Sequence, residues 1–224
     1  AASFFEQKVG AGHSVNDPDS IVLFRDHLTF LAMAMTPERR AQGLLEVADQ
    51  LRIRQEEFSS EQGIRLHGET EHGGSEAICH SKILQDYALP GQLIIGSDSH
   101  TPHSGAIGCV AFGVGTTTIF NSWITQDVYS MVPETVKIEV RGERPSGITA
   151  KDMMLAILRT PYVAEGHAIA KMVEYCGNAV EALSIDERAT MTNMAAEVGA
   201  FSGIVVPDEK TVDFLVSERA LDRE

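Results

Sequence analysis

The 224-residue chain has few cysteines and no long apolar run. Its three cysteines, Cys79, Cys109 and Cys176, include no CxxC pair, which argues against a disulfide framework and favours a reducing compartment. No apolar stretch approaches the ~20 residues that a membrane helix needs. No basic start followed by an apolar segment marks a secretory signal. We therefore expect a cytoplasmic protein with no membrane partner.

Positive charge is also scarce. The 18 Lys and Arg residues face 32 Asp and Glu residues, which gives a formal net charge of −14. This balance argues against a nucleic-acid partner, because phosphate binding needs a clustered surplus of Lys and Arg. It would also repel a polyanionic substrate unless basic groups gathered at the site. Because none of Arg25, Lys82 and Arg141 lies in a strong motif, we expect that positive charge to come from outside this sequence.

Short apolar runs alternate with helical patterns along the chain. Strands are expected at residues 20–24, 65–67, 93–95, 136–140 and 172–176. Helices are expected at residues 37–64, 75–87 and 149–158, and after residues 180 and 186. The glycine-rich residues 105–115 are small and apolar, which suits a helix packed closely on a sheet. This alternation is typical of an α/β fold. A composition shift near residues 130–133 predicts two α/β units, residues 1–132 and 133–224.

The most informative motif follows the apolar run at residues 93–95. Asp98, Ser99 and His100 place a carboxylate, a hydroxyl and an imidazole at the expected carboxyl end of a buried strand. Open α/β sheets bind ligands in the crevice outside that end. The alternative interpretation is a helix cap by Asp98 or Ser99, with His100 merely exposed. The three residues alone do not decide between a site and a cap.

Three other places carry polar groups suited to chemistry. Asp26 and His27 pair an acid with an imidazole, as a proton donor requires, although a solvated strand end explains the pair more simply. His80 lies on an expected helix, where a core histidine is the simpler interpretation. Asn193 and Glu197 are four residues apart among small apolar residues, so they share one helix face. That face is either a solvated stripe or a packed surface whose polar groups need partners.

In order and spacing, the motifs of this chain resemble those of the aconitase superfamily. The matching segments, which extend over residues 15–215, are Ile78–His80, Asp86–Gly91, Gly96–Pro102, Gly113–Gly115, Val132–Val136, Lys151–Asp152 and Thr192–Ala200. Residues 133–136 and 185–188 are more similar to the large subunit of 3-isopropylmalate dehydratase and to homoaconitase than to mitochondrial aconitase. The resemblance implies an aconitase-like α/β/α fold, in which sheets with flanking helices form two units.

The resemblance also implies site residues and a reaction. The implied catalytic residues are Asp26, His27, His80, Asp98, His100 and Glu197. The implied substrate-binding residues are Ser99 and Asn193. The complete enzyme would dehydrate a hydroxy di- or tricarboxylate to an alkene and rehydrate it at the neighbouring carbon. His27 would protonate the departing hydroxyl, while a serine outside this sequence would remove the α-proton.

Enzymes of this superfamily hold a [4Fe-4S] cluster through three cysteines, two of them in a CxxC pair. Because this sequence has no CxxC pair, we expect the cluster ligands to lie outside it and no metal to bind the chain alone. The expected partners are a hydroxy-carboxylate substrate, a cluster-binding domain, and a mobile domain or small subunit. The chain would then be the front portion of a hydro-lyase, with some N-terminal sequence missing, and inactive alone. The alternative is a non-catalytic or truncated aconitase-like domain that binds carboxylates or a partner chain.

Overall fold

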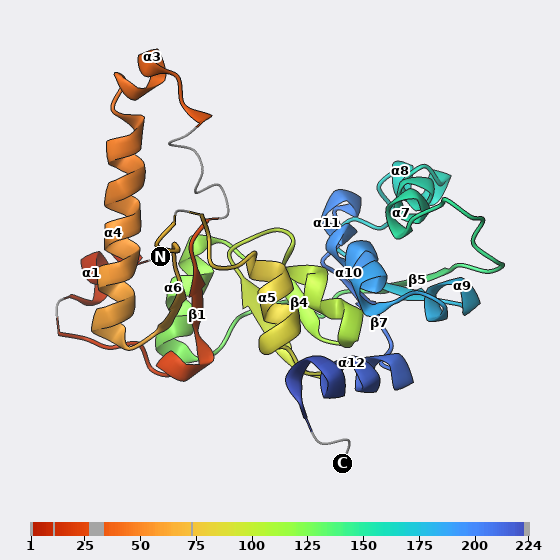
Figure 1. Cartoon of the computed structure of the whole chain (residues 1–224). Coiled ribbons are helices and arrows are strands. Elements are labelled where there is room, and N and C mark those ends of the chain that lie inside the picture. Colours follow the sequence, from red (N-terminus) through yellow and green to blue (C-terminus); the bar gives the residue numbers. More distant parts are fainter. Residues whose placement is uncertain (1, 11, 27–33, 73, 222–224) are drawn as a thin grey trace. The chain divides into compact units, whose positions relative to one another are not determined.

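A computed structural model describes residues 2–10, 12–26, 34–72 and 74–221 (Figure 1). The chain forms two compact units, one from residues 1–79 and 115–129 and the other from residues 80–114 and 130–224. The sequence predicts a boundary between residues 132 and 133, whereas the contacts group residues 80–114 with the residues after 130. The division into domains at residue 132 therefore stays a prediction.

The first unit combines a two-stranded parallel sheet with helices. Its elements are α1 (Ala2–Val9), η1 (Pro18–Ser20), β1 (Val22–Phe24), α3 (Pro37–Arg40), α4 (Leu44–Gln62), β2 (Arg65–His67) and α6 (Thr116–Thr125). β1 pairs with β2 in parallel, with Val22 opposite Arg65. Two helices replace the single one expected over residues 37–64, because Gly43 adopts a left-handed conformation with φ of 73° between them.

Aromatic side chains form the core of the first unit. The ring of Phe5 on α1 packs edge-on against Phe58 on α4, with ring centroids 5.6 Å apart. Phe58 also stacks on Trp123 of α6 at a centroid distance of 5.3 Å. All three side chains are buried, and such ring pairs add to the stabilisation that burial of apolar area provides. The core thus joins α1 and α4 to α6, which is distant in sequence.

The second unit contains two parallel sheets and confirms the expected α/β class. Its elements are α5 (Cys79–Asp86, from its second residue), β3 (Leu93–Gly96), η2 (Thr101–Ile107), β4 (Val110–Gly113), β5 (Thr135–Glu139), α7 (Ala150–Leu158), α8 (Pro161–Ala164), β6 (Met172–Cys176), α9 (Asn178–Glu181), α10 (Ile185–Asn193), α11 (Ala195–Val198), β7 (Ser202–Val205) and α12 (Glu209–Arg219). β3 pairs with β4, and β5, β6 and β7 form the other sheet in that order. Parallel strands require crossover connections, which the intervening helices supply.

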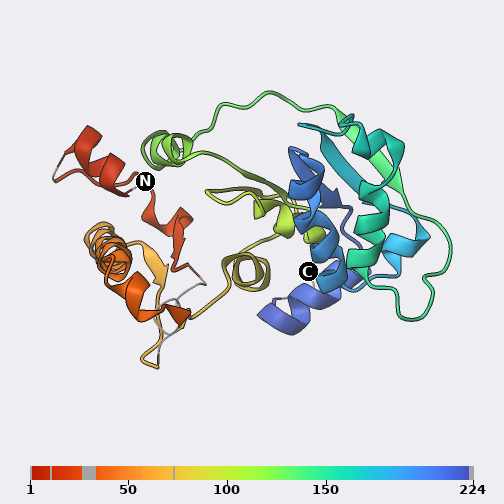
Figure 2. The same ribbon diagram turned by 90° about the horizontal axis from the view of Figure 1, so that it is seen from above.

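Helices α7 and α10 pack together in the second unit, and α10 also contacts β7 (Figure 2). The expected helix start at residue 149 is confirmed, since Thr149 and Asp152 form a capping box at the beginning of α7. The buried side chains of Met154, Val173 and Met191 belong to one apolar cluster. This cluster joins α7 and α10 to the central strand β6.

Residues 105–115 do not form the expected close-packed helix. They complete the 3-10 helix η2 and then form strand β4, which pairs with β3 from Leu93 opposite Val110 onward. The small residues do permit a close approach, because a Cβ on Gly105 would collide with the backbone carbonyl of Gly203 on β7. The glycine pair therefore brings η2 against β7, and η2 also packs on α10.

Candidate functional site

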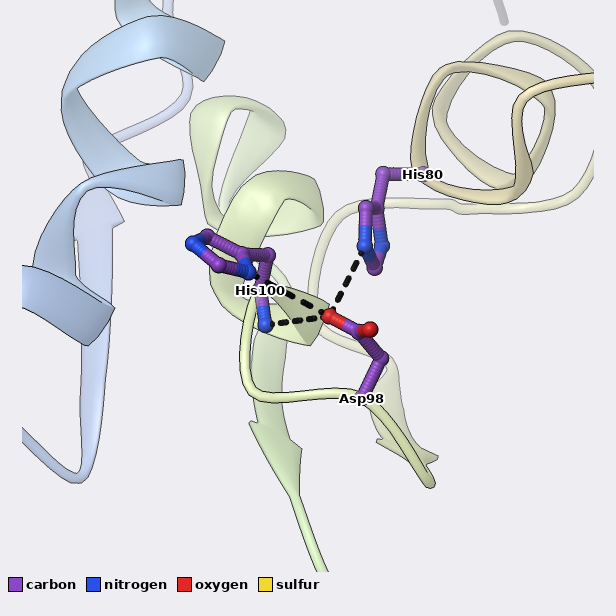
Figure 3. A group of neighbouring side chains, drawn as sticks. All are labelled: His80, Asp98 and His100. Carbon is purple, nitrogen blue, oxygen red and sulfur yellow. Dashed lines mark hydrogen bonds and ion pairs between the residues drawn. The ribbon is translucent and has the colours of Figure 1, made fainter. Parts of the chain in front are cut away.

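The end of strand β3 carries the centre of the candidate site. β3 ends at Gly96, and residues 97–100 form the turn that leads into η2. His80 extends toward this turn from the first turn of α5 (Figure 3). Asn193 ends α10 and Glu197 lies on α11, which follows it. The sequence-based expectation that Asp98, Ser99 and His100 follow a strand is confirmed.

Asp98 contacts both histidines of this group through one carboxylate oxygen. Its Oδ1 atom accepts a hydrogen bond from the backbone N–H of His100 at 2.8 Å. The same oxygen lies 3.1 Å from Nε2 of His80 and 3.4 Å from Nδ1 of His100. Figure 3 shows both imidazoles directed at this one oxygen. Asp98 therefore accepts from a backbone N–H in the turn and also contacts two histidines. It does not cap η2, because the N-cap residue is His100 and no side chain makes a capping hydrogen bond there.

The environment of Asp98 favours its ionised form. Partial burial raises the pKa of Asp98, but the backbone hydrogen bond from His100 and the nearby imidazoles of His80 and His100 outweigh it. Its pKa therefore lies below the usual value. An ionised carboxylate only accepts hydrogen bonds, so His80 must present its Nε2–H to Asp98.

His100 lies between acceptors on both sides of its ring. Nδ1 is 3.2 Å from the Ser99 hydroxyl oxygen in addition to its approach to Asp98. Nε2 lies 3.2 Å from Oε1 of Glu197. The side chains of His100 and Glu197 are 37% and 44% exposed, so the group is open to a ligand from solvent. An imidazole with an oxygen at each nitrogen can hold a proton at either position, as general acid-base chemistry requires.

His103 is a neighbour of this group that the sequence analysis did not identify. Its Nδ1 lies 3.3 Å from Nδ2 of Asn193, and its ring centroid is 6.1 Å from that of His80. Burial, assisted by the charges of His80 and His100, lowers the pKa of His103 to about 4. The available signal was its spacing of three residues from His100, which places two side chains on one side of a 3-10 turn.

Most of the expected site residues come together in the second unit. They are His80, Asp98, Ser99, His100, Asn193 and Glu197. Asn193 and Glu197 do not share one continuous helix, because α10 ends at Asn193 and α11 begins at Ala195. Asp26 is an exposed residue beyond β1 in the first unit, and His27 lies outside the described residues. The roles expected for Asp26 and His27 therefore stay predictions.

An iron–sulfur cluster is held by cysteine thiolates, whereas the metal-ligating side chains that gather in this chain are of another kind. Within the described part of the chain, the one set of three suitable donors is His80, Asp98 and His100, whose donor atoms lie within 4.8 Å of one another. Cys79, Cys109 and Cys176, which all lie in the described ranges, belong to no such set there. Cys109 is buried, its thiol donates to the Leu89 carbonyl oxygen at 3.1 Å, and burial raises its pKa to about 11. A protonated, isolated thiol does not fit the thiolate set that a [4Fe-4S] cluster needs.

Comparison with known proteins decides the family. A model of the Aconitase family (aconitate hydratase) matches residues 3–224. This chain belongs to the aconitase family. It is 36% identical over 210 residues to 3-isopropylmalate dehydratase large subunit 1 of Pyrococcus furiosus and 41% identical over 165 residues to the protein of that name from Pyrococcus abyssi. These matches cover 93% and 73% of this chain but 45% and 38% of the relatives, so the chain spans less than half their length.

Membership of the aconitase family confirms the resemblance seen in the sequence and the aconitase-like α/β fold. Enzymes of this family generally carry a [4Fe-4S] cluster. That its ligands lie outside this sequence remains our expectation. None of the described helices is both long enough and apolar enough to span a membrane.

Proposed function

We propose that this chain forms part of the active site of a hydro-lyase of the 3-isopropylmalate dehydratase type. Such an enzyme removes water from a hydroxy di- or tricarboxylate and adds it back at the neighbouring carbon. The observation that carries the proposal is His100 held between Asp98 and Glu197, with His80 on the same oxygen of Asp98. The printed names of the two Pyrococcus relatives support this class of reaction.

Elimination of water needs a group that binds the hydroxyl and a group that delivers a proton to it. Asp98, held ionised, accepts a hydrogen bond from the substrate hydroxyl or from the water that re-adds. A proton on Nε2 of His100 is donated to Glu197, which then fixes the ring, whereas a proton on Nδ1 faces Asp98 and Ser99. His27 is proposed as the acid for the departing hydroxyl, and Ser99 and Asn193 as substrate-binding groups.

The carboxylates of the substrate require positive charge, and three cations of the described residues are already paired with carboxylates. Arg25 pairs with Glu69, Lys82 with Asp86 and Arg141 with Glu139. A cation that already has a carboxylate partner neutralises an incoming carboxylate less effectively. We therefore assign the substrate-neutralising groups to the rest of the enzyme, including a small subunit of the kind that the relatives' name, large subunit, implies.

The test is conversion of substrate by the complete enzyme that contains this chain, assembled with its partner and with its cofactor loaded. Isopropylmalate-type and citrate-type hydroxy acids are supplied separately, and the conjugated alkene is followed by ultraviolet absorbance and proton NMR. We expect one of these acids to convert to its positional isomer through the alkene. Failure of the loaded enzyme to hydrate either alkene would contradict the proposed function.

A further inference from the structure

His103 has no part in the chemistry proposed above, yet it is packed into the same group. Two consecutive residues of α10 hold it. The Thr192 hydroxyl donates to the backbone carbonyl of His103 at 3.0 Å, and Nδ2 of Asn193 lies 3.3 Å from its Nδ1. Thr192 is fully buried, and the carbonyl of His103 is the nearer of the two acceptors of its single hydroxyl hydrogen, the other being Ala189 at 3.3 Å. The His103 ring is therefore fixed in place against the Asn193 side chain.

The contact between His103 and Asn193 defines the state of both side chains. A carboxamide nitrogen only donates hydrogen bonds, so Nδ1 of His103 must be the acceptor and its ring proton must be on Nε2. An imidazolium has no acceptor nitrogen, so the bond requires the neutral ring, in agreement with the lowered pKa of His103. No described residue donates a hydrogen bond to Oδ1 of Asn193. That oxygen is left as the acceptor for a ligand.

We propose that His103 is a positioning residue that holds the Asn193 carboxamide with Nδ2 toward the protein and Oδ1 presented to the hydroxyl of the substrate or to bound water. This inference rests on the proposed function in one respect, the assignment of Asn193 as a substrate-binding group. A carboxamide rotated by half a turn would present two N–H donors in place of an acceptor. The orientation therefore decides whether Asn193 accepts a hydrogen bond from the substrate or repels its hydroxyl proton.

The direct test is the tautomer of His103 in the complete enzyme. Histidine labelled with 15N distinguishes a protonated from an unprotonated Nδ1 by chemical shift, and the His103→Asn variant assigns the signals. We expect an unprotonated Nδ1 and a protonated Nε2. A proton on Nδ1 would overturn the proposal, whether or not the enzyme converts any substrate. This measurement therefore fails or succeeds separately from the proposed function.

Kinetics provide the second test. His103→Phe keeps a ring but removes the acceptor, and loss of one such hydrogen bond should raise KM by ~10-fold with a smaller change in kcat. His103→Asn restores an acceptor near the position of Nδ1 and should return KM to within about 2-fold of wild type. His167→Phe is the matched control, because His167 is an exposed histidine of the same unit whose ring pairs with Glu165 and packs beside Tyr162. An unchanged KM in a folded His103→Phe enzyme, or an equal rise in His103→Asn, would contradict the positioning role.

Discussion

His103 illustrates how burial of a single residue makes the fold sensitive to acid. Its pKa is about 4 in the folded protein against an ordinary value of 6.5, and the titratable groups that face it are His80 and His100. Because the unfolded chain binds the proton more readily, the stability from this group is complete above pH 6.5. It is lost as the pH falls from that value toward about 4.

The acid sensitivity that His103 confers is measurable as a change in stability between two pH values. Between pH 7 and pH 5, the lowered pKa of His103 should cost the wild-type protein roughly 2 kcal/mol of unfolding free energy. The His103→Asn variant, which cannot titrate there, should lose that much less over the same interval. Urea unfolding of both proteins at each pH measures the difference. Equal losses in the two proteins would show that His103 is not held neutral by the fold.

At the scale of residues, candidate site residues could be predicted from the sequence where polar side chains follow an apolar strand. Asp98 and His100 could be predicted because they follow residues 93–95 directly. For His103 the spacing from His100 was the one signal, and its contact with Asn193 could not be predicted, because it depends on the packing of η2 against α10, a distant part of the sequence. The approach of Glu197 to His100 likewise depends on tertiary packing, although its spacing from Asn193 indicated a shared face.

At the scale of elements, an ion pair between a buried arginine and a partly exposed aspartate joins α10 to the start of α12. Arg188 is fully buried, and its guanidinium forms two hydrogen bonds to the Asp208 carboxylate, at 2.9 and 2.6 Å. Arg188 also donates to the backbone carbonyl of Glu181 at 3.1 Å. Asp208 has a second function, because its side chain caps α12 by accepting from the backbone N–H of Thr211.

Removal of Asp208 should therefore leave a buried cation unpaired and a helix uncapped. We expect Asp208→Ala to lower the free energy of unfolding by about 3 kcal/mol. Asp208→Asn keeps the capping oxygen and should cost less. Asp186→Ala, at an exposed site in the first turn of α10, should cost less than about 1 kcal/mol. Denaturant titration of the three variants measures the order, and an Asp208→Ala cost no larger than that of Asp186→Ala would contradict a structural role for the pair.

Several elements were predictable because their signals are local. The strands β3, β5 and β6 follow from apolar patterns, and α7 follows from its capping residues. The strand β7 was missed, because Ser202 and Gly203 begin it with no β-sheet pattern. Packing selects the glycine there, since a Cβ on Gly203 would meet Ala195 and Tyr175. No local pattern contains that information.

At the scale of the whole molecule, the family could be predicted from the order of motifs, while the grouping of contacts could not. The attachment of residues 80–114 to the later part of the chain depends on the approach of Gly105 to Gly203 and on the hydrogen bonds from α10 to η2. These contacts join segments ~90 residues apart in sequence. Contacts over such a separation produce no local pattern in the sequence from which they could be predicted.

If the group around Asp98 is catalytic, variants of that group lose turnover without losing the fold. His100→Ala and Asp98→Asn are assayed in the complete, cofactor-loaded enzyme beside a thermal melt, with His167→Ala as the matched control for loss of an exposed histidine. We predict that turnover falls by ~10²–10⁴-fold in both site variants and stays near wild type in the control. We also predict that the His100→Ala and control proteins keep their stability to within about 0.5 kcal/mol. Turnover close to wild type in His100→Ala and Asp98→Asn, or a melting shift large enough to account for the loss, would contradict a catalytic role for this group.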